Sequence, residues 1–146
     1  MRISTNWHIK TFKHEHETIQ TVDAAYSTDI YYDSQAKATP DAEAVVFKDH
    51  RYTYAEVDDI SDRIAGYILS KGLGVGDAVS VIIPRCEWMA IASLGVLKAG
   101  CAYQPLDPSY PKERLNFMVK DAAAKLLIAD ESLRGLLDGC YRAHYP

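Results

Sequence analysis

The chain has 146 residues, with 16 Lys and Arg against 20 Asp and Glu and a formal net charge of -4. Apolar residues make up 48% and charged residues 25% of it, which is typical of a globular protein. The lack of a basic excess argues against nucleic-acid binding. No apolar run is long enough to span a bilayer or to form the core of a signal peptide. We therefore expect neither nucleic acid nor a membrane as a partner.

The three cysteines, Cys86, Cys101 and Cys140, are odd in number and far apart, and no Cys-x-x-Cys pair occurs. This pattern favours neither a disulfide framework nor a zinc site, and it predicts a protein of the reducing cytoplasm. Cys86 and Cys101 stand among apolar residues, which predicts small buried side chains rather than nucleophiles.

Residues 1–26 are polar and weakly periodic, and we interpret them as a leader or an inter-domain linker. They contain the one metal-like cluster, His14-Glu15-His16 with His8 nearby. Because this cluster has no second set of ligands and no rigid frame, a solvated polar stretch is the favoured interpretation.

A helix is predicted from Ser27 to Ala38, with Ser27 or Thr28 as its cap and Pro40 ending it. The β-branched and aromatic segments Ala44–Phe47 and Arg51–Thr53 then predict a hairpin, with its turn at Asp49-His50.

Thr53 and Glu56 have the spacing of a capping box and predict the start of a second helix. Its apolar residues fall on one stripe at helical spacing: Val57, Ile60, Ile64, Tyr67 and Ile68. Its charged residues fall on the other face, which we expect to be solvated and to hold an Asp59–Arg63 ion pair: Asp58, Asp59, Asp62 and Arg63.

Gly72, Gly74 and Gly76 form a Gly-x-Gly-x-Gly run that could suggest phosphate binding. A phosphate loop follows a strand and opens a helix, whereas this run closes a helix and leads into a strand. It therefore predicts a helix end and a turn.

The run Val79–Ile83 predicts a strand buried on both faces, as in a parallel sheet. The segment Glu87–Lys98 is apolar almost all round and predicts a buried helix, with Trp88 and Met89 in the core. Gly100 is expected to end that helix.

A short strand is predicted at Ala102–Gln104, stopped by Pro105. Pro111 is expected to open a helix at its first position, with four residues facing inward: Leu115, Met118, Val119 and Ala122. A strand at Lys125–Ala129 and a short helix at Ser132–Leu137 follow, and residues 139–146 form an irregular tail. Strands that alternate with helices indicate an α/β fold with a mostly parallel sheet.

The segment Leu97–Pro111, LKAGCAYQPLDPSYP, followed by Arg114 and Leu115, resembles the second core motif of nonribosomal peptide synthetase adenylation domains. Thr53–Val57 resembles their first core motif, residues 38–47 resemble the entry to the domain, and Lys71–Asp77 looks like its helix-to-strand turn. The resemblance covers roughly residues 27–130, in the family's order and spacing.

The departures from the family pattern are mild: Tyr52 and Val57 stand where the first motif has Leu, and Gln104 replaces an apolar residue. The resemblance implies that residues 27–138 are the N-terminal part of the adenylate-forming enzyme fold, with a parallel sheet flanked by helices and a hairpin near its start.

The resemblance also implies an enzyme that uses ATP with magnesium to form an aminoacyl adenylate and then loads a carrier-protein phosphopantetheine thiol. The expected partners are the rest of the adenylation domain, a carrier domain and a condensation domain. In the family, the ATP phosphates are held by a Ser/Thr/Gly-rich loop ending in Lys-Gly, and a Lys of the small C-terminal subdomain assists the reaction. Residues 1–146 contain no counterpart of either.

We therefore expect the chain to contain no catalytic, cofactor-binding or metal-ligating residue and to be inactive alone. The most chemical-looking residues of the second motif are Lys98, Asp107 and Arg114, and we expect them to form ion pairs that fix a loop rather than to contact ATP or substrate.

Two alternatives remain open at this point. The chain could be a non-catalytic assembly module that docks on a separate chain through the exposed edges of an incomplete sheet. It could also belong to an acyl-coenzyme A ligase, a relative in fold, although the Tyr103–Pro111 segment favours the peptide-synthetase branch.

Overall fold

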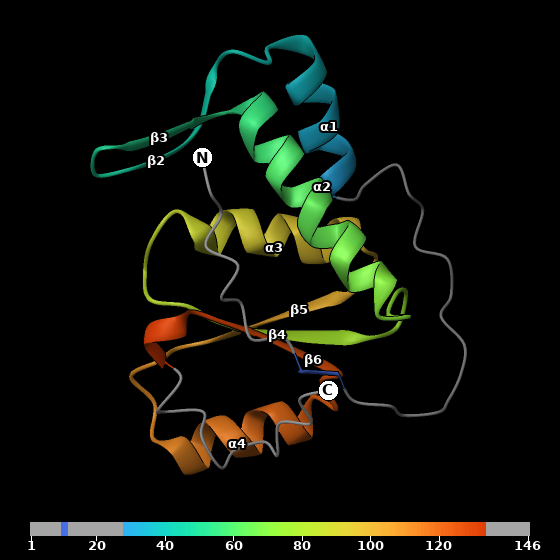
Figure 1. The fold of residues 1–146 in the computed structure, drawn as a ribbon, viewed down its shortest axis with the longest axis vertical. Helices are drawn as coiled ribbons and strands as arrows, with labels where there is room; N and C mark the ends of the chain where they lie inside the picture. The colour runs from blue at the N-terminus through green and yellow to red at the C-terminus, as the bar shows by residue number, and fades with distance from the viewer. Residues whose placement is uncertain (1–9, 12–27, 134–146) are drawn as a thin grey trace. The chain divides into compact units, whose positions relative to one another are not determined.

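The computed structural model describes residues 10–11 and 28–133, and the predicted order of helices and strands is confirmed within residues 28–133 (Figure 1). The elements are β1 Lys10–Thr11, α1 Thr28–Ala38, β2 Glu43–Phe47, β3 His50–Thr53, α2 Tyr54–Ser70, β4 Ala78–Ile82, α3 Trp88–Lys98, β5 Ala102–Leu106, α4 Lys112–Asp121 and β6 Leu126–Ala129, then a short 3-10 helix, Glu131–Leu133. The fold class is α/β, as predicted. The described residues form two compact units: a helical unit (28–77 and 85–102) and a sheet unit (10–11, 78–84 and 103–133).

The core of the helical unit lies between α2 and α3. Val57 and Ile60 of α2 and Ile91 and Leu94 of α3 are buried together. The hairpin and α1 contribute partly buried side chains around them, among them Tyr32 and Tyr52. Removing this apolar surface from water is the main stabilising contribution to the unit.

Helix α2 begins with the predicted capping box. The Glu56 backbone N–H donates to Thr53 Oγ1 at 3.3 Å, and the Thr53 N–H donates to the Glu56 carboxylate at 2.8 Å. Two donors that a helix start leaves without partners are thereby satisfied. The helix ends at Ser70, and Gly72, which follows the cap residue Lys71, has a φ of +75° that suits glycine. The glycine run is therefore the predicted helix end and turn.

The apolar stripe of α2 is shifted from the prediction. Val57, Ile60 and Ile68 are buried as expected, but Tyr67 is 40% exposed, and Ser61 and Ala65 take the inward positions instead. Ser61 lies where α3 approaches α2, since its carbonyl oxygen would be 3.1 Å from a Cβ on Gly95. Such a close approach favours small side chains.

Helix α3 comes very close to α2 at Gly95. A Cβ atom on Gly95 would lie 2.6 Å from the Ile64 Cβ and 3.1 Å from the Ser61 carbonyl oxygen. The helix was predicted to be buried all round, and Ile91, Ala92 and Val96 are fully enclosed. Met89 and Trp88 depart from this, since Met89 is exposed and Trp88 is half-buried at the edge of the core. Gly100, with φ +75°, ends the helix as expected.

The hairpin turn lies one residue earlier than predicted. Phe47 pairs with His50, which leaves Lys48 and Asp49 as the two turn residues and places His50 in β3. Lys48 adopts a φ of +53°, the left-handed conformation that such short hairpin turns require. Because lysine is uncommon in that conformation, the residue types do not reveal this turn position.

In the sheet unit the strand order is β1-β6-β4-β5. Strands β4 and β6 run parallel, with Val79 opposite Leu126 and Ile82 opposite Ala129. All four residues of β6 are buried, as are Val79–Ile82 of β4, which confirms the prediction of a parallel core pair. Lys10 and Thr11 form a short antiparallel strand on β6, an element that the linker interpretation of residues 1–26 does not include.

Helix α4 packs on the sheet through Leu115 and Val119, which join Ile82, Leu106 and Leu127 in one buried cluster. Met118 is only partly buried beside that cluster, and Ala122 is also partly exposed. Pro111 precedes the helix as its N-cap, with φ −54° and ψ 145°, rather than occupying the first helical position as predicted. The segment Ser132–Leu137 is a 3-10 turn as far as Leu133.

Strand β5 continues through Pro105 to Leu106, so the prediction that Pro105 stops the strand was wrong. A proline is tolerated within a strand where its missing N–H would face away from the neighbouring strand.

None of the helices in residues 28–133 is long and apolar enough to cross a membrane.

Candidate functional site

The turn that follows β5 is fixed by Asp107. Its Oδ1 accepts the Ser109 backbone N–H at 2.8 Å, and its carbonyl oxygen accepts the Tyr110 N–H at 3.1 Å. An aspartate that binds the backbone two residues later closes a turn by itself. Asp107 therefore stabilises a loop, as the sequence suggested, and it does so through backbone donors.

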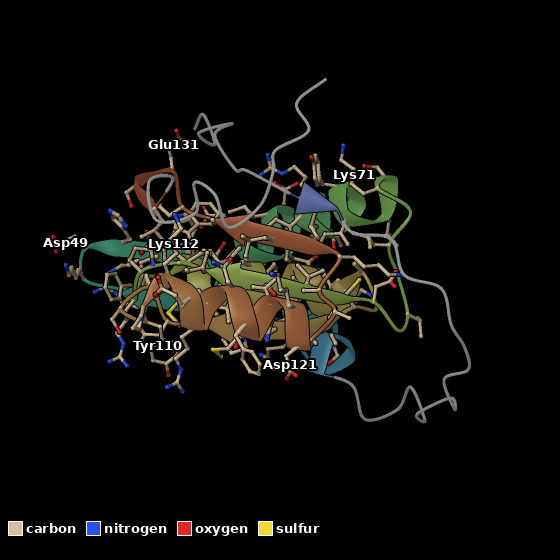
Figure 2. The ribbon with its side chains drawn as sticks, turned by 90° about the horizontal axis from the view of Figure 1, so that it is seen from below. Asp49, Lys71, Tyr110, Lys112, Asp121 and Glu131 are labelled. Atoms are coloured by element: carbon tan, nitrogen blue, oxygen red, sulfur yellow. The ribbon has the colours of Figure 1, made fainter. Side chains whose placement is uncertain are left out.

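Arg114 lies in the first turn of α4, and its guanidinium carbon is 4.6 Å from the centre of the Tyr110 ring. Figure 2 shows Tyr110 at one end of α4 and Asp121 at the other. The guanidinium and the aromatic face attract each other electrostatically. This contact joins the second-motif loop to α4, which follows it. Arg114 thus makes a cation–π contact where the sequence predicted an ion pair.

Lys98 is a largely enclosed cation of the helical unit, with 8% of its side chain exposed. Its ammonium donates to Asp58 at 2.5 Å and to Asp62 at 2.6 Å, and it lies 3.5 Å from an Asp33 carboxylate oxygen. It is also 5.9 Å from the centre of the Tyr32 ring. We call Lys98, Asp33, Asp58 and Asp62 the lysine cluster. It ties α3 to α1 and α2, so Lys98 joins helices rather than fixing a loop.

The electrostatics of the lysine cluster favour the charged ammonium. Burial lowers the pKa of Lys98, but the hydrogen bonds to Asp58 and Asp62 outweigh burial, and the net pKa is raised. Tyr32 donates its hydroxyl to the Tyr54 carbonyl at 3.1 Å, and burial, followed by the Asp58 charge, raises the pKa of its phenol. Lys98 and Tyr32 each hold one protonation state near neutral pH, which suits a fixed scaffold.

A second polar group joins three elements of the sheet unit. Ser80 of β4, which is fully buried, donates to Gln104 Oε1 of β5 at 2.5 Å, and Gln104 Nε2 donates to the Met118 carbonyl of α4 at 3.0 Å. This contact explains the departure at Gln104: the glutamine completes the hydrogen bonding of a buried serine. The sequence showed both residues but not that they meet.

We predict that Ser80→Ala lowers the free energy of unfolding by about 1–2 kcal/mol, because Gln104 Oε1 loses its buried donor. Urea denaturation measures the change. In a Gln104→Leu background, Ser80→Ala should cost less stability than it does in the wild-type protein, because the acceptor that would lose its donor is no longer there. If the two single losses simply add, the two side chains are not coupled.

Glu87, just before α3, has a buried carboxylate that sequence reasoning missed. Its Oε1 lies 2.5 Å from Nδ1 of the exposed His50, which links the hairpin to the start of α3. Burial and then the nearby Glu87 charge raise the pKa of Tyr52. No spacing rule could have paired two residues 37 positions apart.

The described residues contain no group of three His, Cys, Asp or Glu side chains placed to hold a metal ion. His8, the His14–His16 cluster, Cys140 and the tail 139–146 lie outside the described residues. Cys101 is buried, as predicted, and its Sγ lies 3.3 Å from the Gly74 carbonyl oxygen. Cys86 is only partly buried, and neither cysteine is in a disulfide.

Within residues 28–133, the candidate residues named from the sequence do not form a site that fits ATP. The glycine run is a helix end, and the three chemical-looking residues of the second motif, Lys98, Asp107 and Arg114, contact carboxylates, a backbone N–H and an aromatic ring. That the chain supplies no catalytic, cofactor-binding or metal-ligating residue stays a prediction.

Comparison with known proteins identifies the family to which this fold belongs. The family described as AMP-binding enzyme matches residues 32–142. The chain belongs to the AMP-binding enzyme family. It is 41% identical over 113 residues to polyketide synthase PksN and 41% identical over 99 residues to a dimodular nonribosomal peptide synthase, both of Bacillus subtilis (strain 168). These matches cover 77% and 68% of this chain, but only 2% and 4% of the two relatives.

Among solved structures, the AMP-binding chain is similar to the nonribosomal peptide synthetase FmoA3. The form of FmoA3 with alpha-methyl-L-serine-AMP bound is 34% identical, with a TM-score of 0.74, over 83% of this chain and 14% of FmoA3. VinN, solved with L-aspartate, has the same TM-score at 24% identity over 80% of this chain and 30% of VinN, and shares the fold. The resemblance to synthetase adenylation domains is thereby confirmed.

Proposed function

We propose that the chain is a scaffold segment of an amino-acid-activating adenylation domain. The proposed reaction joins an amino acid to ATP, forms the aminoacyl adenylate and releases pyrophosphate. The acyl group then passes to the phosphopantetheine thiol of a carrier domain, and a condensation domain is a further partner. The observation that carries the proposal is the second-motif segment, whose sequence resembles that of synthetases and whose charged residues all take part in contacts that hold the fold.

In this proposal, ATP and magnesium bind to residues that this segment does not contain. ATP supplies the adenylyl group when bound. This chain's own residues hold together the fold that surrounds that site. The lysine cluster holds α3 on α1 and α2, and Asp107 and Arg114 shape the loop between β5 and α4. A cytoplasmic location for the reaction is supported by Cys86 and Cys101, which are not joined in a disulfide.

A chimera tests the proposal. Residues 28–133 of this chain replace the matching segment of FmoA3, and amino-acid-dependent ATP–pyrophosphate exchange is measured with alpha-methyl-L-serine. We expect the chimera to keep exchange, with a rate reduced by no more than about tenfold, since the chemistry lies outside the exchanged segment. A chimera that unfolds cooperatively but shows no exchange would contradict the scaffold role.

A matched chimera carrying Gly95→Ala serves as the control. It should be less stable than the first chimera, and at temperatures where both are folded it should have the same KM for ATP, because Gly95 packs between helices. A raised KM for ATP in the control would place this segment in ATP binding and would contradict the proposal in another way.

A further inference from the structure

Strand β5 lies at one end of the described sheet, with β4 as its neighbour. An edge strand presents a row of backbone donors and acceptors to which another strand can bind. Proteins commonly protect such an edge with charged side chains. Strand β5, Ala102-Tyr103-Gln104-Pro105-Leu106, contains no charged residue. Its protection against strand addition must therefore come from another feature.

The backbone direction of β5 follows from one hydrogen bond. The Ala102 N–H donates at 2.8 Å to the carbonyl of Asp77, the residue just before β4. Backbone groups alternate between the two sides of a strand. The backbone groups of Ala102, Gln104 and Leu106 consequently face β4, and those of Tyr103 and Pro105 face the outer edge.

Pro105 has no N–H, so the outer edge of β5 offers one donor, the Tyr103 N–H, where an ordinary strand of this length would offer two. The pyrrolidine ring also takes up space at the point where an incoming strand would pair. Pro105 is exposed, as is expected of a residue at a free edge. Its place within the strand costs no bond to β4, which explains why β5 continues past it.

We propose that Pro105 protects the outer edge of β5 against strand addition, so that the sheet does not extend beyond β5 either through a second copy of this chain or through another strand. This role concerns the edge alone and does not depend on the proposed function. The opposite end of the described sheet is formed by β1, which pairs with β6.

Two substitutions separate the missing N–H from the missing charge. Pro105→Val and Pro105→Lys both restore the N–H, but only Lys adds a charge that protects an edge. Light scattering after size-exclusion chromatography measures the mass of the full chain at several concentrations. We expect Pro105→Val to gain mass with concentration relative to the wild-type protein, and Pro105→Lys to keep the wild-type mass. A Pro105→Val variant that matches the wild-type protein at every concentration would overturn the proposal.

Hydrogen exchange in the wild-type chain tests the same proposal without any variant, so a variant that fails to fold does not decide it. The Tyr103 amide should exchange at least about tenfold faster than the Gln104 amide, which faces β4. Equal protection of the two amides would show that a strand already covers this edge and would overturn the proposal.

Discussion

Replacing Gly95 by alanine should lower the free energy of unfolding by about 2 kcal/mol, because the new Cβ would overlap the neighbouring helix. That Cβ would lie 2.6 Å from the Cβ and Cγ2 atoms of Ile64, and 3.1 Å from the Ser61 carbonyl oxygen. The Ile64 side chain branches at Cβ and cannot rotate away freely, and the Ser61 atom belongs to the backbone. Urea denaturation of the full chain measures the change.

Gly66→Ala is the matched control for this prediction. Gly66 lies within α2, and a Cβ there would meet nothing within 4 Å. Since alanine favours a helix over glycine, the control should gain about 0.5–1 kcal/mol. If both variants become more stable, the close approach of α2 and α3 at Gly95 is wrong.

The second large effect is expected for Lys98→Met. This change keeps most of the apolar stem but leaves three carboxylates facing one another without the ammonium that joins them. Removing one partner of a buried ion pair costs about 3–5 kcal/mol, but these carboxylates are partly exposed, so we expect a loss of about 2 kcal/mol. The midpoint of urea denaturation at pH 7 gives the result.

Arg63→Met provides the control, because it breaks an exposed pair with Asp59 of similar geometry, at 2.7 Å. Its expected cost is no more than about 0.5 kcal/mol. The raised pKa of Lys98 also fixes a pH dependence. The stabilisation from the ammonium is complete below the ordinary lysine pKa of about 10.4 and is lost as the pH rises through the higher folded-state value. Equal losses for the two variants at pH 7 would contradict a special role for Lys98.

Much of the fold could be predicted because its signals are local. The capping box at Thr53, the buried run that became β4 and the glycine at position 100 each depend on residues within a few positions, and the structure contains each feature. The predictions were wrong where the structure depends on residues that are far apart in the sequence. Tyr67 is exposed while Ser61 and Ala65 of the same helix are buried, and β5 continues through Pro105 to Leu106.

In the candidate site, too, local features could be predicted and contacts between distant residues could not. The second motif could be found from its residue order, and its charged residues were expected to form contacts that fix a loop. The partners could not be foreseen: Lys98 meets Asp58 across 40 positions, and Ser80 meets Gln104 across 24. Asp58 and Asp62 were assigned to a solvated face because a helical pattern shows which residues share a face but not what packs on it.

The most direct test of this account is ATP–pyrophosphate exchange by the isolated chain of 146 residues, measured with each of the twenty amino acids in the presence of magnesium. The account predicts no exchange above the rate without amino acid, because this sequence has no counterpart of the Ser/Thr/Gly-rich loop that the family resemblance assigns to the phosphates. Exchange that depends on one amino acid would contradict it, and would mean that these residues include an ATP site.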